Sequence, residues 1–404
     1  MISEKSSNVK TVVVVGGGVA GAEVVRGLSS RLNPEKHRLV LITSRPRYTF
    51  LPASLRLLAS QDTPLGSVFM SYSTVFGKFP GEIKIGTVTS IEENKDPAFK
   101  RGGFIVMKGD EKILYDVVVV ATGSKWDGHL AFPDDEEGFK AHVKSWQKKI
   151  RDADNIVVAG GGAVGIEMSG EIKDAYPASL SFCSKPLYLM TSIIQTKSIT
   201  IVHANRLLLG DMYPDKFRND IETRLRLRGV NIIFNDTIEG TPNPHAPLKT
   251  GNGISLPCDL LVLARGGRPN TSLLKYLRPN VLSDRGYIRV RPTLQIDRHP
   301  NMFALGDVID WPEAKQLTKI SMGHTAVVIA NVMSYLGGKA PKKTYTKSPE
   351  ILSISNGRTG GASYVGLLWG LTFGNYFTKL VKSDDLMVGF VRKAMGLGQE
   401  CEKD

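Results

Sequence analysis

Runs of consecutive apolar residues predict buried strands that alternate with helices. Residues 12–15 and 156–159 are apolar throughout, and such runs are typical of parallel strands covered on both faces. Each is followed by a glycine-rich turn and a stretch with helical character, the first at 19–32. Further buried strands are expected within 116–124 and 301–308. The pattern therefore predicts an α/β fold built on parallel sheets.

Both predicted strand-to-helix turns fit the pattern G-x-G-x-x-G. The first turn consists of Gly16, Gly18 and Gly21, and the second consists of Gly160, Gly162 and Gly165. Glycines allow a tight turn and a close approach to a pyrophosphate, whose charge lies at the N-terminus of the next helix. A single match is weak evidence, but a strand before and a helix after each turn strengthen it. Two such turns predict two dinucleotides; the alternative is that one is a relic or an ordinary tight turn.

Three further segments, together with the two glycine turns, occur in a recognisable order along the chain. The strand within 116–124 ends in Ala121, Thr122 and Gly123, with a partial echo at 259–270. Asp307 follows a strand and Gly306, where a carboxylate can accept hydrogen bonds from a ribityl chain. This order resembles that of flavoprotein reductases with two dinucleotide-binding domains. The resemblance implies two Rossmann-like domains, the FAD domain interrupted by the NAD(P)H domain, plus a small C-terminal α+β domain.

The expected boundaries follow from that resemblance. They are 1–140 and 276–338 for the two parts of the FAD-binding domain, 141–275 for the NAD(P)H-binding domain and 345–404 for the C-terminal domain. The NAD(P)H domain contains an apparent insertion near 178–196, since its connection from the glycine turn to the next strand is longer by about sixteen residues. A surface insertion, a membrane-touching element and a translated intron all remain open.

The cysteines exclude a thiol relay. Only three are present, Cys183, Cys258 and Cys401, and they are too far apart for a C-x-x-x-x-C pair, a disulfide framework or a zinc cluster. We therefore expect no metal site, and we expect electrons to pass from reduced nicotinamide to flavin and then to an external acceptor.

Local strings narrow the resemblance to one branch. They are FMSYSTVFG at 69–77, GGGAVGIEMSGEIKDAYP at 160–177, TIVHANRLL at 200–208, ALGDV at 304–308, HTAVVIANV at 324–332 and LVKSDDL at 380–386. Together they are similar to the apoptosis-inducing-factor-homologous, ferroptosis-suppressor branch of NAD(P)H:quinone oxidoreductases. That resemblance implies FAD as prosthetic group, NADPH or NADH as donor, a ubiquinone-type acceptor and peripheral attachment to a membrane.

The resemblance also implies roles for individual residues. Arg56, Val88 and Asp307 are expected to contact the flavin nucleotide, with Thr122 and Gly123 beside them. For Arg56 the alternative is a solvent-exposed helix charge.

Two further positions are expected to be catalytic. Glu167 is expected to position the nicotinamide, and Lys382 to stabilise a reduced flavin anion or a quinone oxygen. A helix-capping or dipole-pairing role is the alternative for Glu167, and a surface lysine is the alternative for Lys382.

Neither predicted ribose site carries the usual acid. In the first domain Thr43 takes that position, and its hydroxyl can still donate a hydrogen bond to the ribose. In the second domain the strand ends at His203, followed by Asn205 and Arg206. A 2′-phosphate repels a carboxylate and attracts arginine, so NADPH is expected to be preferred over NADH or used equally well. The alternative is an ordinary basic loop.

Charge and the C-terminal composition bear on partners and location. The formal net charge of +13 favours anionic partners, including phosphorylated cofactors, a membrane surface or nucleic acid. Residues 359–378 contain no charge and are rich in aromatic side chains. We expect this edge to contact a membrane, with Lys379 and Lys382 near the lipid charge; a homodimer contact or packing against the FAD domain are the alternatives.

The expected location is cytoplasmic and peripheral to a membrane, which could be that of a lipid droplet, the mitochondrial outer membrane or the plasma membrane. The first ten residues lack a secretory pattern. The second hypothesis for the function is non-specific DNA binding, as in some apoptosis-inducing factors. The third is a type II NADH dehydrogenase.

Overall fold

A five-stranded parallel sheet forms one half of the molecule. The computed structural model describes residues 9–94, 101–177, 197–240, 247–367 and 370–398. The strand order is β18 (Met302–Ala304), β9 (Val117–Val120), β1 (Lys10–Val15), β2 (His37–Thr43) and β5 (Glu82–Ile85). The central strand β1 is parallel to both neighbours, and its residues 12–15 are buried. The helices α1 (Val19–Ser29) and α7 (Thr325–Leu336) pack against each other beside this sheet.

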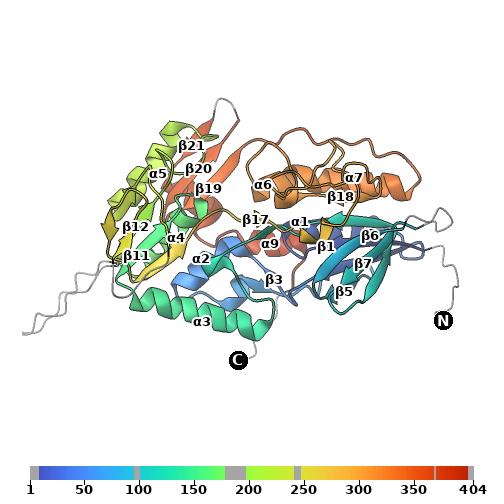
Figure 1. Cartoon of the computed structure of the whole chain (residues 1–404), viewed down its shortest axis with the longest axis horizontal. Helices are drawn as coiled ribbons and strands as arrows, with labels where there is room; N and C mark the ends of the chain where they lie inside the picture. The colour runs from blue at the N-terminus through green and yellow to red at the C-terminus, as the bar shows by residue number, and fades with distance from the viewer. Residues whose placement is uncertain (1–8, 95–100, 178–196, 241–246, 368–369, 399–404) are drawn as a thin grey trace, which may run out of the picture.

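A four-stranded parallel sheet forms the other half (Figure 1). Its order is β13 (Val230–Ile233), β12 (Ser198–Val202), β11 (Asn155–Ala159) and β16 (Leu260–Leu263). Its helices are α4 (Ala163–Ala175) and α5 (Asp215–Leu227), and α3 (Glu136–Asp152) leads into it. All four strands come after β9 and before β18 in the chain. The second sheet is therefore inserted into the first along the sequence, and the predicted α/β class with two Rossmann-like parallel sheets is confirmed.

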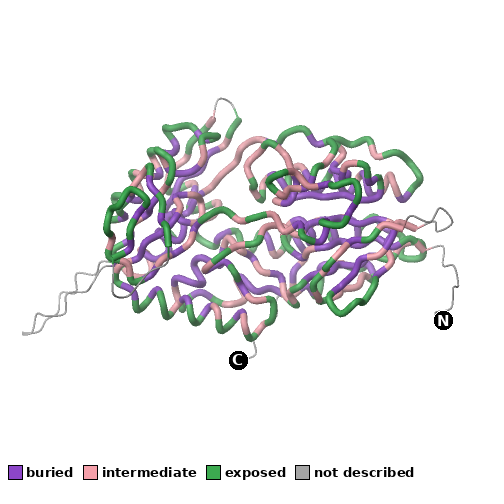
Figure 2. The backbone as a smooth tube through the Cα atoms, viewed as in Figure 1, coloured by how far each residue is buried: buried purple, intermediate pink, exposed green. Residues whose placement is uncertain are grey.

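Two crossings of the chain between the halves run along a short antiparallel ribbon. This ribbon pairs β10 (Ser124–Lys125) with β17 (Arg268–Pro269). The helix α2 (Leu51–Ala59) of the first half also packs against α4 of the second. Figure 2 shows that the buried residues concentrate in the strands of both sheets.

Two antiparallel sheets complete the fold. The first contains β6 (Val88–Glu93), β7 (Gly103–Met107) and β8 (Lys112–Tyr115), and the second contains β19 (Ile351–Ser355), β20 (Gly361–Val365) and β21 (Leu371–Phe373). The second sheet is followed by α8 (Asn375–Thr378), the π-helical turn η7 (Lys379–Ser383) and α9 (Val388–Met395). Because β19 and β20 pack on α4 and α5 while α9 packs on α1, the C-terminal segment contacts both halves.

The described parts of the uncharged stretch 359–378 form β20, β21 and α8. Among the described residues, no helix is both long and apolar enough to cross a bilayer. The apparent insertion at 178–196 lies outside the described residues.

Candidate active site

The first glycine turn has the geometry that only glycine permits. Gly16 has a φ of +110°, and a Cβ there would lie 2.3 Å from the Ala121 carbonyl oxygen. A Cβ on Gly21 would lie 1.8 Å from the Gly16 oxygen, so the helix α1 can approach the strand only with glycine at this position. Gly18 begins α1 without a side-chain cap and with open space beside it. The first backbone N–H groups of α1 are therefore available to an anion.

The second glycine turn repeats this geometry. Gly160 has a φ of +124°, and a Cβ there would lie 2.6 Å from the Ala264 carbonyl oxygen. A Cβ on Gly165 would lie 2.0 Å from the Gly160 oxygen. Gly162 begins α4, again with no side-chain cap and open space. Both turns thus have the shape and the helix dipole that suit a dinucleotide pyrophosphate.

Thr43 and His203 occupy matching places at the two turns. Thr43 is buried at the end of β2, and a Cβ on Gly17 would lie 2.7 Å from its Oγ1. His203 follows β12, and its Nδ1 accepts a hydrogen bond of 3.1 Å from the N–H of Gly161. Burial lowers the pKa of His203, and because Nδ1 accepts this hydrogen bond, the ring proton lies on Nε2. This Nε2 is buried, and among the described residues it has no hydrogen-bond partner; contact of His203 with a nucleotide stays a prediction.

The loop after His203 is held by charged side chains of α5. Asn205 and Arg206 are exposed, and Arg206 pairs with Asp215 at 2.7 Å. The buried Arg218 donates to the carbonyls of Leu207 and Leu208, at 3.2 and 2.8 Å. Arg206 thus lies on the loop where sequence reasoning expected a phosphate contact, but a carboxylate already holds it.

Asp307 lies at the crossing ribbon. The Ser124 hydroxyl donates to Asp307 Oδ2 at 2.9 Å, so the turn after β9 and the turn after β18 meet. Thr122 donates to the Asn270 carbonyl at 2.6 Å, and Gly123 adopts a φ of +63°. Val88 is half-buried at the start of β6 and pairs with β7 rather than with either parallel sheet. Contact of these residues with flavin stays a prediction.

Sequence reasoning missed a buried polar cluster beside Asp307. His324 Nδ1 accepts a hydrogen bond of 3.3 Å from Gly306 N–H, so its Nε2 donates to Glu313 at 2.8 Å. Tyr345 donates to the second oxygen of Glu313 at 2.5 Å. Although burial raises the pKa of Glu313, the hydrogen bonds from His324 and Tyr345 lower it overall. No local motif links these three residues, so only the fold reveals the cluster.

Glu167 and Lys382 form a buried ion pair. Lys382 Nζ lies 2.5 Å from Glu167 Oε1, and their side chains are 14% and 7% exposed. The same oxygen accepts a hydrogen bond of 2.9 Å from Ser355 N–H, and Lys382 also donates to the Ser353 carbonyl at 2.8 Å. The alternative of a surface position for Lys382 is therefore wrong. The carboxylate of Glu167 binds Lys382 and Ser355 rather than capping α4, and pairing with the helix dipole stays an alternative. The two residues predicted to be catalytic lie together, although their roles stay predictions.

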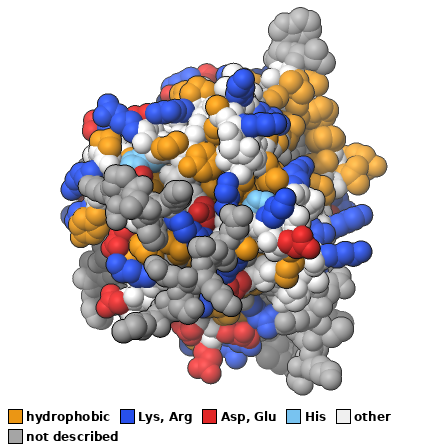
Figure 3. Space-filling model, turned by 90° about the vertical axis from the view of Figure 1, so that its right-hand side faces the viewer, with side chains coloured by type: hydrophobic (Ala, Val, Ile, Leu, Met, Phe, Trp, Pro, Cys, Tyr) orange, Lys and Arg blue, Asp and Glu red, His pale blue; other side chains and the backbone are white. Residues whose placement is uncertain are grey.

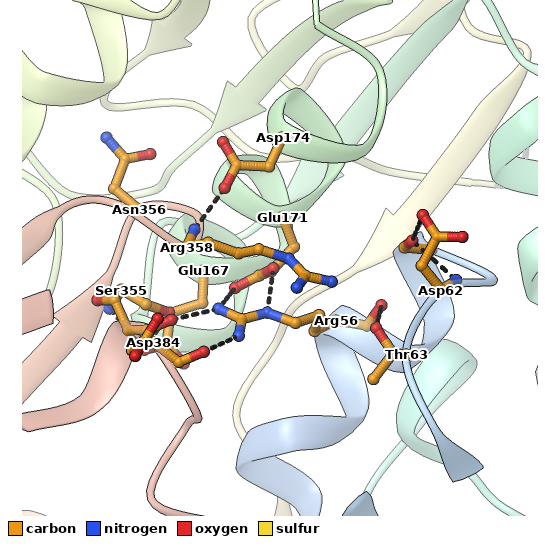
Figure 4. Close-up of polar contacts among 12 residues, drawn as sticks. Arg56, Asp62, Thr63, Glu167, Glu171, Asp174, Ser355, Asn356, Arg358 and Asp384 are labelled. Atoms are coloured by element: carbon orange, nitrogen blue, oxygen red, sulfur yellow. Dashed lines mark hydrogen bonds and ion pairs between the residues drawn. The ribbon is translucent and has the colours of Figure 1, made fainter.

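Arg56 is buried and bonded on several sides (Figure 4). Its Nε and Nη2 donate to the two oxygens of Glu171 at 2.8 and 3.0 Å. Its Nη1 and Nη2 donate to the carbonyls of Asp384 and Ser383 at 2.7 and 2.6 Å. The alternative of a solvent-exposed helix charge is therefore wrong. The predicted flavin contact stays a prediction, with four of the five guanidinium N–H groups already engaged.

Comparison with known proteins gives one consistent result. Residues 10–329 match the family model described as pyridine nucleotide-disulphide oxidoreductase. A protein named FAD-dependent oxidoreductase FVFD30, from Flammulina velutipes, is 39% identical over 84% of this chain and 99% of its own. Ferroptosis suppressor protein 1 of Taeniopygia guttata is 27% identical over 95% of each chain.

The fold is also similar to that of solved structures. The sulfide:quinone oxidoreductase of Aquifex aeolicus superposes with a TM-score of 0.69 over 97% of this chain and 98% of the other, at 17% identity. The resemblance inferred from the sequence motifs is confirmed by the family match and by the relatives that cover most of the chain.

Proposed function

The chain belongs to the pyridine nucleotide-disulphide oxidoreductase family, and from that premise we propose that it is an NAD(P)H:quinone oxidoreductase. Its cofactors are FAD and NAD(P)H, and the two glycine turns fit one dinucleotide each. The chemistry that the flavin supplies when bound is hydride acceptance and onward electron transfer. Gly16, Gly18 and Gly21 are the residues that would hold its pyrophosphate, and the second turn would hold that of NAD(P)H.

The observation that carries the proposal is the buried pair of Glu167 and Lys382. Glu167 lies on α4, five residues after Gly162, the N-cap of this helix. Lys382 comes from the C-terminal segment, and the described residues accept two of its three N–H groups. The remaining N–H can stabilise negative charge that develops on an acceptor oxygen. Glu167 holds this ammonium in place and orients the nicotinamide.

A quinone is the acceptor that best agrees with the sequence and the surface. No cysteine pair is spaced for a thiol relay, so an external acceptor is needed. The solved sulfide:quinone oxidoreductase has the same fold. Tyr376, Leu380 and Phe390 are 86%, 76% and 66% exposed on the C-terminal segment. Such apolar side chains support a peripheral membrane contact, where a quinone with an isoprenoid tail resides.

NADPH is the donor that we propose to be preferred or used equally well. His203, Asn205 and Arg206 line the end of β12, and this stretch contains no acid. Arg206 can bind a 2′-phosphate when the phosphate competes with Asp215 for its guanidinium.

Nucleic acid binding remains the second candidate because of the net charge of +13. On the face shown in Figure 3, Lys and Arg side chains lie among acidic and hydrophobic ones and form no single patch. Electrostatic binding of DNA depends on many neighbouring phosphate contacts, so this face gives it little support.

The test is NADPH oxidation by the purified flavoprotein with short-chain ubiquinone, menadione or oxygen as acceptor. Lys382→Met is expected to lower kcat with quinone by roughly a hundredfold, as expected for the loss of one charge-stabilising donor. Lys148→Met is the control, because Lys148 is exposed on α3. Quinone turnover that is no faster than oxygen reduction, or unchanged in Lys382→Met, would contradict the proposal.

A further inference from the structure

The helix α4 presents three carboxylates on successive turns, and each binds a different cation. Glu167 pairs with Lys382 at 2.5 Å, and Glu171 pairs with Arg56 at 2.8 Å. Asp174 pairs with Arg228. Residues spaced by three or four lie on one face of a helix. Figure 4 shows that this face of α4 lies between the helix that carries Arg56 and the C-terminal segment.

Arg56 belongs to one of these three parts of the chain and forms hydrogen bonds with the other two. Its helix α2 belongs to the first half, its ion-pair partner Glu171 belongs to the second, and its two carbonyl partners belong to the C-terminal segment. The side chains of Arg56 and Glu171 are 6% and 3% exposed. Water therefore competes little for these hydrogen bonds, and charge-assisted bonds are the strong ones in such surroundings.

The two carbonyls bound by Arg56 are those of Ser383 and Asp384, which directly follow Lys382. They lie at the end of the π-helical turn η7, where carbonyls lack partners in the helix itself. A cation at a helix C-terminus is also favoured by the helix dipole. The guanidinium thus fixes the main chain at the point from which the Lys382 side chain reaches Glu167.

We propose that Arg56 is a positioning residue that sets Lys382 against Glu167 and makes this alignment depend on the docking of the two halves. The inference rests on the proposed function for the importance of Lys382, but the positioning itself is a property of the fold. Lysine cannot replace arginine here, because an ammonium lacks the planar fork that reaches a carboxylate and two carbonyls together.

Arg228 provides a matched control. It also joins a carboxylate of α4 to a C-terminal carbonyl, since it binds Asp174 and the Asn356 oxygen. Its contacts lie at Asn356 rather than beside Lys382. Asn356 follows Ser355, which binds Glu167, so Arg228→Lys perturbs the same interface and the same kind of ion pair but leaves the Ser383 and Asp384 carbonyls bound to Arg56.

The direct test is amine labelling of the purified flavoprotein, with the modified lysines read by mass spectrometry. Lys382 is largely buried, and the exposed Lys379 in the same segment is the internal reference. Arg56→Lys is expected to speed the labelling of Lys382 relative to Lys379 by about tenfold, the factor for one lost charged hydrogen bond. Arg228→Lys is expected to leave the ratio unchanged. An unchanged ratio in Arg56→Lys, or an equal rise in both variants, overturns the proposal.

A double-mutant cycle then measures the effect on turnover. Arg56→Lys is expected to lower kcat with little change in the KM for NAD(P)H, and to have no further effect in a Lys382→Met background. Additive losses overturn the positioning role. If Lys382→Met alone leaves turnover unchanged, the proposed function of Lys382 fails, and the labelling ratio alone decides whether Arg56 positions it.

Glu171→Gln is a second variant that keeps the proposal testable if Arg56→Lys does not fold. Glu171→Gln removes the carboxylate charge but leaves both carbonyls to hold Arg56. It is expected to raise Lys382 labelling by less than Arg56→Lys does. A larger rise than in Arg56→Lys would show that Glu171, not the carbonyl contacts, controls Lys382, and would overturn the proposal.

Discussion

Low pH is expected to lower the free energy of unfolding through protonation of His129. This residue lies in the segment that crosses between the two halves. His129 lies in the 3₁₀ turn Gly128–Leu130, after β10 and before α3. It is 0% exposed and packs edge-on to Trp146, with ring centroids 5.7 Å apart. Among the described residues neither of its ring nitrogens has a hydrogen-bond partner. Burial and, second, the charge of His142 lower the pKa of His129 to about 4.

The sign and size of the effect follow from this shift. The folded-state pKa lies below the ordinary value of 6.5, so the unfolded chain binds the proton more readily. The stability contributed by neutral His129 is complete above pH 6.5 and is lost as the pH falls toward 4. The loss amounts to about 2 kcal/mol by pH 5 and about 3 kcal/mol by pH 4. Other groups titrate in this range, so the contribution of His129 must be isolated by substitution.

The assay is thermal unfolding followed by circular dichroism between pH 7.5 and 5. His129→Phe keeps an aromatic ring against Trp146 and removes the titrating group, so its melting temperature is expected to fall less steeply with pH than that of the unaltered protein. His142→Phe is the comparison, because His142 is only half-buried and its Nε2 already bonds the His129 carbonyl. Equal pH dependence in the unaltered protein and in His129→Phe would refute the reasoning.

Three further predictions concern the nucleotides and the surface. Asp215→Asn is expected to raise kcat/KM for NADPH roughly two- to fivefold and to leave kcat/KM for NADH unchanged, because it frees Arg206 from an exposed ion pair. Asp211→Asn is the control, and an equal change in kcat/KM for both donors contradicts a role of Arg206 in binding the 2′-phosphate. Gly16→Ala is expected to abolish the visible flavin absorbance of the purified protein, whereas Gly160→Ala is expected to keep it and to weaken NADPH binding in a titration. Removal of residues 359–404 is expected to abolish flotation with anionic liposomes, and flotation without them would exclude this segment as the contact.

The local parts of the fold could be predicted from the sequence. The apolar run predicted at 12–15 lies in β1, and that at 156–159 lies in β11. The predicted helix at 19–32 begins at Val19 but ends at Ser29. These features depend on neighbours in the chain and on the steric freedom of glycine, so a single sequence contains the information.

The long-range part of the site could not be predicted in the same way. The resemblance implies a flavin contact for Arg56, which stays a prediction, but it gives no sign of the bond to Glu171, which lies 115 positions away in the chain. Tyr345 lies in a polar linker, and its bond to Glu313 arises only when the linker folds back. The composition of the uncharged stretch at 359–378 suggests a membrane contact, but it does not specify the two strands and the short helix that the described part forms. In each case the tertiary partner decides the role, and composition does not specify that partner.

The two glycine turns share one backbone geometry, and the side chains that cover them differ. Over the first turn, the buried Tyr72 donates to the Gly17 carbonyl at 2.7 Å, and the buried Thr43 packs beside it. Over the second, the half-buried His203 and the buried Leu208 lie against Gly161, but residues 204–206 are exposed and Arg206 forms an exposed ion pair with Asp215. A covered turn favours slow exchange of its ligand, and an exposed loop favours fast exchange. We therefore predict that a nucleotide bound at the first turn exchanges more slowly than a nucleotide bound at the second.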